Sequence, residues 1–343
     1  MPLLAVRIPL EASKLPFDAA LPGLALLCEP SQLKVTLSRL LAQWLGPDAH
    51  LFDSRAYLRR LSPGKRCSVE LELVVGRKNG VPAEGRRLLG KFYTGNQGAT
   101  VSGTLEELRR HGFGAGRFIV PRPLAYEPEY HLLLLTWAEG ELLSSVVLAH
   151  SDAAREIAGA AEWLLGLHKC GVGTGRRYSF LSHLQTLAGW KDLLTEMYPE
   201  TERSLGALLA RFEERGRDLT GWTPGPTHRD FSPEHLVVQG DQFTGLDFDE
   251  FCQYDPLFDV AHFTAHLRFL GLAHFGALNH FDWLADRFLA AYEAGGGDYS
   301  EERLRFYKAI AYLKLGRFVA LVQRPQGWRQ ILPELLSEAR RLV

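Results

Sequence analysis

Hydrophobic residues between positions 55 and 136 recur at the spacing of β-strands. In KRCSVELELVV, at residues 65–75, apolar side chains occupy the odd positions 67 to 73 and polar side chains lie between them. This alternation is typical of a strand with one buried face. The stretch RRLLGKFY, at residues 86–93, predicts a second strand, and Asn79-Gly80 predicts the turn of a β-hairpin that joins the two.

Beyond Gly140 the hydrophobic spacing becomes that of amphipathic helices. In the segment 150–171, apolar residues recur every three or four positions from Ile157 to His168, and Gly171 predicts the end of a helix. Further helices are predicted at residues 203–216, 281–295, 301–323 and 331–342. The part of the chain before Gly140 carries two helical patterns as well, at residues 31–46 and at residues 100–112, the second ended by Gly112.

These patterns predict an α+β chain in two lobes. The first lobe, residues 1–136, combines a leading helix with a small antiparallel sheet. The second lobe, residues 137–343, is mainly helical and holds one loop-rich segment at residues 226–256. No internal repeat divides either lobe further.

Composition excludes several classes of function. The 343 residues carry a net charge of −1, so there is no broad basic surface for nucleic acid or an anionic membrane. Four cysteines lie far apart without a CxxC pair, which favours a reducing compartment. No run of eighteen apolar residues predicts a membrane span, and the N-terminus lacks a basic leader. We therefore expect a cytoplasmic protein.

Candidate chemistry gathers in the loop-rich segment. HRDFSPEHLVV, at residues 228–238, places Asp230 in a loop where its carboxylate can meet a substrate hydroxyl. Asp247 follows the end of a strand, and carboxylate oxygens are the ligands that Mg²⁺ prefers. Lys91 lies on the second strand of the predicted hairpin, on one face with Leu89 and Tyr93. A base, a metal ligand and a cation for phosphate are what phosphoryl transfer requires.

The order of several motifs resembles the aminoglycoside phosphotransferase family, whose members share the protein-kinase-like fold. The matching stretches are IVPRPLAY, LLLLTWAEGELL, WLLGLHKCG, HRDFSPEHLVV, GLDFDEF and DPLFDVAHF, in that order. Together they extend the resemblance over roughly residues 55–270. Each stretch alone is a weak signal, and the joint order is specific.

The resemblance implies a role for each matching residue. Asp230 would be the catalytic base, and Asp247 would bind Mg²⁺ that bridges the β- and γ-phosphates of ATP. Lys91 would contact the α- and β-phosphates. Thr136 and Ala138 would bind adenine through their backbones. The segment LSPGKR, with Ser62 and Gly64, would cover the phosphates.

Three features depart from the family pattern. The fifth position after the base is usually asparagine, a magnesium ligand, and here it is His235. His235 is expected at the metal or nucleotide, with a plain loop role as the alternative, although its imidazole suits magnesium poorly. The phosphate-covering segment holds one glycine only. The glutamate that should pair with Lys91 would be Glu106 or Glu107, yet neither lies on the apolar face of its predicted helix.

Neighbouring residues are expected to have structural roles. His228 would brace the catalytic loop through hydrogen bonds, and His168 would be a buried residue at a helix end. Asp259 would accept hydrogen bonds from loop backbone in the second lobe. Arg229 and Glu234 are expected to be surface charges.

The acceptor is expected to be a small hydroxylated molecule such as an aminoglycoside, a sugar or an amino alcohol. Seven residues separate Asp247 from Asp255, too few for a segment that holds a peptide substrate. Residues 229–259 hold eight acids against one base, which weakly favours a cationic acceptor. Two other interpretations stay open: a nucleotide-binding module without turnover, and a metal-dependent hydrolase with His228, Asp230, His235 and Asp247 as ligands.

Overall fold

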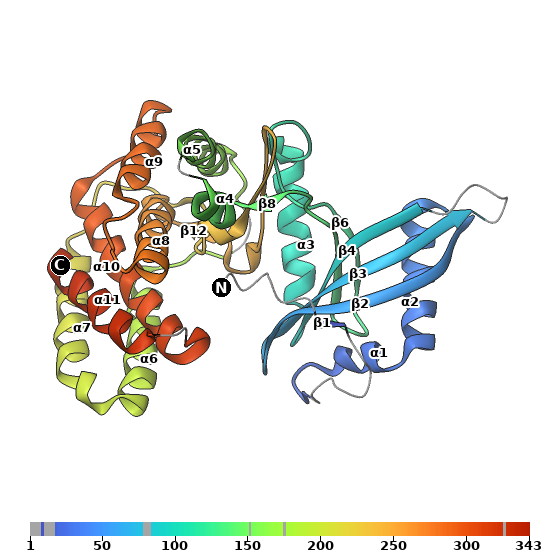
Figure 1. Ribbon diagram of the computed structural model, residues 1–343, viewed down its shortest axis with the longest axis horizontal. Helices are drawn as coiled ribbons and strands as arrows, with labels where there is room; N and C mark the ends of the chain where they lie inside the picture. Colours follow the sequence, from blue (N-terminus) through green and yellow to red (C-terminus); the bar gives the residue numbers. More distant parts are fainter. Residues whose placement is uncertain (1–7, 10–17, 78–83, 151, 174–175, 325–326) are drawn as a thin grey trace. The chain divides into compact units, whose positions relative to one another are not determined.

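Two compact units divide the chain, Met1–Glu139 and Gly140–Val343. The computed structural model describes residues 8–9, 18–77, 84–150, 152–173, 176–324 and 327–343. Strands dominate the described part of the first unit and helices that of the second (Figure 1). The predicted α+β class is confirmed.

The first unit is built on an antiparallel sheet with the strand order β1-β2-β3-β4-β7-β6. Its strands are β1 (Ile8–Pro9), β2 (Ala49–Ser62), β3 (Arg66–Arg77), β4 (Glu84–Tyr93), β6 (Pro123–Glu127) and β7 (Leu132–Thr136). A short strand β5 (Phe118–Ile119) precedes β6. The predicted hairpin is confirmed by the antiparallel pairing of β3 with β4, whereas its Asn79-Gly80 turn lies outside the described residues.

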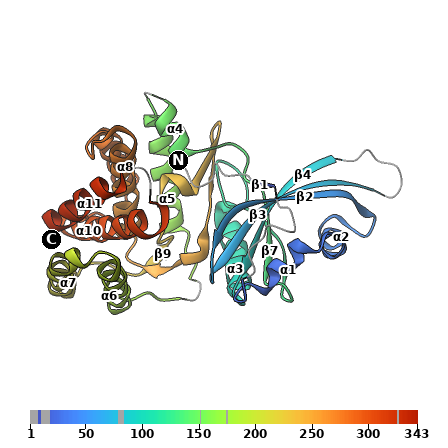
Figure 2. The ribbon, with the colours of Figure 1, turned by 60° about the horizontal axis from the view of Figure 1, so that its bottom comes forward.

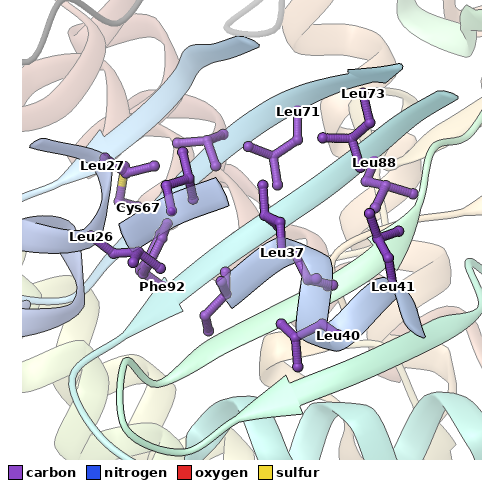
Figure 3. Packing of buried hydrophobic residues seen from close by; sticks show 14 of the residues in the cluster. Leu26, Leu27, Leu37, Leu40, Leu41, Cys67, Leu71, Leu73, Leu88 and Phe92 are labelled. Atoms are coloured by element: carbon purple, nitrogen blue, oxygen red, sulfur yellow. The ribbon is translucent and has the colours of Figure 1, made fainter. Parts of the chain in front are cut away.

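One face of this sheet forms the core of the first unit. The odd positions 67 to 73 of β3 are almost fully buried, as the alternation predicted. They pack against α1 (Ala25–Cys28) and α2 (Pro30–Leu45), with Leu37, Leu40 and Leu41 of α2 pointing toward the strands (Figure 3). The leading helix therefore exists, and covering this sheet face with apolar side chains is what holds it there.

The opposite face of the sheet is more polar. Glu70 of β3 is 1% exposed, and its carboxylate lies 3.3 Å from Arg59 and 4.0 Å from Arg87. Both guanidinium groups lie over the ring of Trp137, at 5.6 and 5.2 Å from its centroid. Helix α3 (Gln97–Leu108) packs against β4, β6 and β7.

The second unit is a body of packed helices. α5 packs with α9, α6 with α7, and α10 with both α8 and α11 (Figures 1 and 2). The helices are α4 (Leu143–Ala149), α5 (Ala154–Lys169), α6 (Phe180–Met197), α7 (Glu202–Arg217), α8 (Leu257–Phe275), α9 (Asp282–Ala294), α10 (Glu301–Phe318) and α11 (Trp328–Leu342). Five of them were predicted, and α4, α6 and α8 were missed. No helix in the described part of the chain is long and apolar enough to cross a membrane.

Short strands carry the loop-rich segment of the second unit. β8 (Glu141–Leu142), β10 (Leu236–Gln239) and β11 (Gln242–Gly245) pair antiparallel, as do β9 (Gly225–Thr227) and β12 (Cys252–Tyr254). The hairpin β10–β11 brings the loop before β10 beside the loop after β11. These two loops hold the candidate catalytic residues.

Candidate active site

The loop between β9 and β10 is fixed by a carboxylate from α8. Asp259, which is fully buried, accepts hydrogen bonds from the backbone N–H groups of His228 and Arg229, both at 2.7 Å. His168, at the end of α5, lies 3.2 Å from the same carboxylate and 2.8 Å from the hydroxyl of Tyr292. The structural roles predicted for Asp259 and His168 are confirmed. These contacts tie the loop to α8 and, through His168, to α5.

His228 braces the two loops against each other. Its ring is buried, and Nε2 donates to the carbonyl of Leu246 at 2.8 Å while Nδ1 accepts from the backbone N–H of Asp230 at 3.3 Å. Burial lowers the pKa of His228, so the imidazole is neutral at physiological pH. The predicted bracing role is confirmed. Because both ring nitrogens are engaged, the four-ligand metal site of a hydrolase is not formed.

Arg229 is not the surface charge that the sequence predicted. It is 8% exposed, and its guanidinium carbon lies 3.4 Å from the centroid of the Tyr178 ring. Its Nη1 lies 3.4 Å from the carboxylate of Glu250. The residue has a left-handed backbone, with φ of 65°, a conformation that costs about 1 kcal/mol or more for a side chain of this kind. Stacking, the ion pair and the Asp259 hydrogen bond offset that cost.

Asp230, His235 and Asp247 form a compact cluster. Each offers one ligand atom, and these atoms all lie within 4.8 Å of one another. Nδ1 of His235 donates to the backbone carbonyl of Asp230 at 2.6 Å, which leaves the lone pair on Nε2, 3.8 Å from the carboxylate of Asp247. Asp247 also has a left-handed backbone, with φ of 59°. The cluster therefore presents two carboxylates and one imidazole lone pair to a shared point.

This donor set fits a divalent cation. Carboxylate oxygens suit Mg²⁺, and a neutral imidazole oriented by a backbone carbonyl is the usual form of a histidine ligand. Mixed oxygen and nitrogen donors suit Mn²⁺ or Zn²⁺ better than Mg²⁺. Of the candidate metal-binding groups in the described residues, this is the one in which three such side chains converge.

A lysine that the sequence did not reveal contacts the candidate base. Nζ of Lys314, on α10, lies 2.5 Å from Oδ1 of Asp230 and donates to the carbonyl of Arg229 at 3.3 Å. Burial alone would raise the pKa of Asp230, but the charge of the neighbouring Lys314 holds that pKa well below its usual range. Asp230 is therefore ionised at neutral pH.

Two histidines of α8 lie on the same side of Asp230 as Lys314. His262 is fully buried, its Nδ1 donates to the carbonyl of Phe231 at 2.8 Å, and its Nε2 lies 3.6 Å from Oδ1 of Asp230. Burial, followed by the charge of Lys314, lowers the pKa of His262 well below its ordinary value. His266 lies next to it, with ring centroids 4.4 Å apart, and burial lowers its pKa to about 3. Both rings are neutral.

Cations from distant elements offset the acids counted in the sequence. Asp255 is paired with Arg303 at 2.9 Å, and Asp241 with Arg155. Glu250 is near Arg229 and, at 4.0 Å, Arg176. Asp230 and Asp247 belong to the cluster, and Asp259 accepts hydrogen bonds from the loop backbone. When these partners are included, the net negative charge around the segment is much smaller than the count of its own residues suggested.

Lys91 lies in the first unit, in the middle of β4. It is 5% exposed, opposite Ser68 of β3, and its Nζ lies 5.5 Å from the centroid of the Tyr93 ring. Of the two glutamates considered as its partner, Glu106 is exposed and Glu107 pairs with Arg110 at 2.7 Å. The helical spacing predicted that neither glutamate lies on the buried face of α3, and this prediction is confirmed.

The predicted phosphate-covering segment is the turn between β2 and β3. Lys65 N–H donates to the carbonyl of Ser62 at 3.0 Å, and Gly64 has φ of 68°, which glycine adopts without strain. The N–H of Gly64 donates to the carboxylate of Asp18 at 2.7 Å. The N–H of Gly64, which was expected to donate to a phosphate oxygen, therefore already donates to a carboxylate.

The residues expected at adenine lie at the end of β7. The N–H of Thr136 donates to the carbonyl of Arg122 at 3.0 Å, and the Thr136 hydroxyl accepts from the N–H of Arg122 at 2.9 Å. The amide of Thr136 is thus already used within the sheet. Ala138 follows two residues later, half-buried and outside regular secondary structure.

Comparison with solved structures identifies the fold. A choline/ethanolamine kinase family protein from Mesorhizobium loti is 14% identical, with a TM-score of 0.53 over 91% of this chain and 94% of that one. Spectinomycin phosphotransferase with ADP and spectinomycin is 12% identical, with a TM-score of 0.55 over 90% and 93%. Amicoumacin kinase hAmiN, with AMP-PNP and Ca²⁺, is 10% identical, with a TM-score of 0.60 over 90% and 93%. The predicted kinase-like fold is confirmed.

The sequence itself identifies the family. The profile of the phosphotransferase enzyme family matches residues 85–307, well over half of the chain. The protein therefore belongs to the phosphotransferase enzyme family, as its motifs predicted. The matched region includes Lys91, Asp230 and Asp247. No curated protein matches the chain.

Proposed function

We propose that this protein transfers the γ-phosphoryl group of ATP to a hydroxyl group of a small molecule. The observation that carries the proposal is the convergence of Asp230, His235 and Asp247 within 4.8 Å, inside the region that matches the phosphotransferase family. Structures similar in fold were solved with ADP or AMP-PNP, together with spectinomycin in one and amicoumacin in another. A small-molecule acceptor also agrees with the seven residues between Asp247 and Asp255.

In the proposed reaction the acceptor oxygen attacks the γ-phosphorus, and the bond from that phosphorus to the β–γ bridging oxygen breaks. ADP leaves, and the hydroxyl proton passes to the carboxylate of Asp230. With a depressed pKa, Asp230 is a weak base, so its first role is to orient the hydroxyl for in-line attack. The proton moves late, when the new bond to phosphorus has made the oxygen acidic.

Asp247 and His235 would hold a divalent cation, with Asp230 beside them. A cation there neutralises charge on the β- and γ-phosphates. The protein prepares the site through the Nδ1–H donation of His235, which aims Nε2 at the shared point. His228 contributes by fixing the loop that carries Asp230.

We further propose, from the family resemblance, the residues that hold the nucleotide. Lys91 would contact the α- and β-phosphates. Gly64 and Ser62 would meet phosphate oxygens, with Gly64 exchanging the carboxylate of Asp18 for a phosphate. Thr136 would contribute its carbonyl, because its amide is engaged, and Ala138 would contribute its backbone.

An Asp230→Asn variant tests the proposed function. Asparagine keeps the shape but cannot accept the proton, so acceptor-dependent ADP release should fall by about 10²- to 10⁴-fold. Affinity for ATP, measured by calorimetry, should change by less than about threefold. The matched control is Asp241→Asn, an acid of the same segment that lies at the surface in a pair with Arg155. It should leave turnover unchanged.

Two results would overturn the assignment. Nucleotide binding by the wild-type protein without turnover on any acceptor favours a binding module instead. Equal turnover by wild type and Asp230→Asn removes Asp230 as the base.

A further inference from the structure

Two cations lie one turn apart on the same side of α10. Lys314 and Arg317 are separated by three positions, which places their side chains side by side on a helix. Both are half-buried, with the Lys314 side chain 24% exposed. Burial lowers the pKa of Arg317. Arg317 therefore places a second positive charge beside Lys314, whose ammonium group contacts Asp230.

Arg317 lacks an anionic partner within the described residues. Its Nε is shielded from solvent and makes no hydrogen bond there, and its guanidinium lies 5.6 Å from the centroid of the Trp190 ring on α6. A buried donor left unpaired costs free energy, and a buried charge costs more. A guanidinium held against an aromatic ring in this way is oriented for a planar anion such as a carboxylate or a phosphate.

Lys314 has donor capacity beyond its two protein contacts. An ammonium group offers three N–H donors. Two of them are used by Asp230 Oδ1 and by the carbonyl of Arg229. The third is directed at no acceptor in the part of the chain that the structure describes. The Asp230 side chain is itself 26% exposed, so a ligand can reach the pair.

A buried acceptor atom faces the same point. Nε2 of His262 is shielded from solvent, has no hydrogen-bond partner among the described residues and lies 3.6 Å from Oδ1 of Asp230. Since Nδ1 carries the hydrogen, Nε2 presents a lone pair. The neutral ring adds no positive charge beside Lys314, so Lys314 and its helix neighbour Arg317 supply the cations for an anionic group.

We propose that the phosphoryl acceptor is a hydroxylated molecule that carries a carboxylate or a phosphate, bound by Arg317 with Lys314 beside the reacting hydroxyl. The proposal rests on the proposed function and names its substrate class. Lys314 alone would also suit a contact with the transferred phosphoryl group. That alternative leaves the buried, unpaired Nε of Arg317 unexplained.

The charge distribution argues against a cationic acceptor at this point. The segment 229–259, which suggested one, has Asp255, Asp241 and Glu250 engaged with arginines. The groups left facing the acceptor side of Asp230 are positive or neutral. An ammonium-bearing acceptor would meet Lys314 as a like charge, whereas an anion is attracted by both cations.

An acceptor panel on the wild-type protein is the first test. ADP release is measured with D-glycerate, ribose 5-phosphate, glycerol, ethanolamine and kanamycin, and binding of each is measured by calorimetry with AMP-PNP present. We expect D-glycerate or ribose 5-phosphate to bind and react best. A preference for D-glycerate indicates that the site binds a carboxylate, and a preference for ribose 5-phosphate indicates that it binds a phosphate. Preference for glycerol, ethanolamine or kanamycin, or no binding by either anion, would overturn the inference.

Variants at Arg317 give the second test. Arg317→Met should weaken binding of the preferred anionic acceptor by about 10- to 100-fold, seen as a raised KM with a smaller change in kcat. Arg317→Glu should move the preference toward ethanolamine. Arg305→Met, at an exposed arginine of the same helix, is the matched control and should bind the anions as the wild type does.

The two proposals fail in different ways. Failure of the proposed function appears as the absence of Asp230-dependent transfer to any acceptor. Failure of the acceptor inference appears as transfer that an anion does not improve and that Arg317→Met does not impair. If Arg317→Met binds D-glycerate and ribose 5-phosphate as the wild type does, Arg317 does not bind the anion. This holds even if the assay detects no turnover.

Discussion

The two oxygens of the Asp230 carboxylate have different partners. Oδ1 lies 2.5 Å from Lys314 and 3.6 Å from His262, whereas Oδ2 lies 3.7 Å from Nδ1 of His235. One oxygen therefore faces the proposed acceptor side and the other the proposed metal side. A carboxylate fixed at both ends loses little freedom when the substrate binds, which is how a positioned group lowers a barrier.

At the residue scale, the histidine of the cluster predicts an unusual metal preference. His235→Asn replaces a nitrogen donor by an amide oxygen, so the Mg²⁺ concentration that gives half-maximal activity should fall by about tenfold. Mn²⁺ accepts either donor, so the Mn²⁺ concentration that gives half-maximal activity should change less. Titration of ADP release with each metal measures both.

The companion variant at this position is His235→Ala, which removes the donor altogether. It should raise the concentration of both Mg²⁺ and Mn²⁺ that gives half-maximal activity. If His235→Asn raised the Mg²⁺ requirement as much as His235→Ala does, His235 would be part of the loop framework and not a ligand.

Sequence proximity decided which site residues could be predicted. Asp230, His235 and Asp247 lie in two loops joined by one short hairpin, so their convergence follows from local chain geometry. Lys314 is 84 residues from Asp230, in a helix with no motif. Only packing of α10 against α8 brings it to the site. The charge count overlooked three pairing cations for the same reason, because Arg303, Arg155 and Arg176 come from distant elements.

At the element scale, glycine sets the distance between α5 and β11. A Cβ atom at Gly159 of α5 would lie 2.2 Å from the ring of Phe243 in β11, and one at Gly245 would lie 2.1 Å from the ring of Trp163 in α5. Two reciprocal contacts of this kind mean that helix and hairpin touch without room for a methyl group. The hairpin carries the loops of the candidate site, so this contact positions them.

Substitution of Gly159 by alanine should therefore destabilise the protein, although alanine normally favours a helix. We expect a loss of about 1 to 3 kcal/mol from overpacking against Phe243. Urea denaturation followed by circular dichroism measures it. Gly206→Ala in α7 is the control, since nothing lies within 4 Å of its Cβ position, and it should gain about 0.5 to 1 kcal/mol. Stabilisation by both variants would refute the tight contact.

Two of the three helices that the sequence missed lack a clear polar face. The missed helix α6 exposes large apolar residues, with Leu181 at 66%, Leu193 at 46% and Met197 at 49%, and these hide its period. α8 is buried on nearly every side from Leu257 to Leu272, so it lacks a polar face as well. The strands β3 and β4 were predictable because one face packs on α2 and the other is polar.

At the scale of the whole molecule, a net charge of −1 leaves little overall repulsion to drive unfolding when the pH changes. The pH dependence of stability must then come from individual groups whose pKa differs between the folded and unfolded chain. Glu338 of α11 is one such group. Its carboxylate binds Arg341 at 2.7 and 2.8 Å and Arg268 of α8 at 2.5 Å.

Hydrogen bonds from Arg341, followed by those from Arg268, lower the pKa of Glu338 to about 2 against the burial that would raise it. A carboxyl group with a depressed folded pKa stabilises the protein fully above its unfolded pKa of about 4.5. That contribution is lost as the pH falls toward 2. Glu338→Gln should therefore be less stable than the wild type by about 1 to 3 kcal/mol at pH 7, with the difference shrinking between pH 5 and pH 3.

Urea denaturation of both proteins at pH 7, 5, 4 and 3 measures that difference. Glu334→Gln, at an exposed glutamate on the same helix, separates the effect of the network from the loss of a negative charge. Its stability relative to the wild type should not change over this range. A Glu338→Gln difference that stayed constant from pH 7 to pH 3 would mean that Glu338 contributes through shape and packing, and that its charge does not tie α11 to α8.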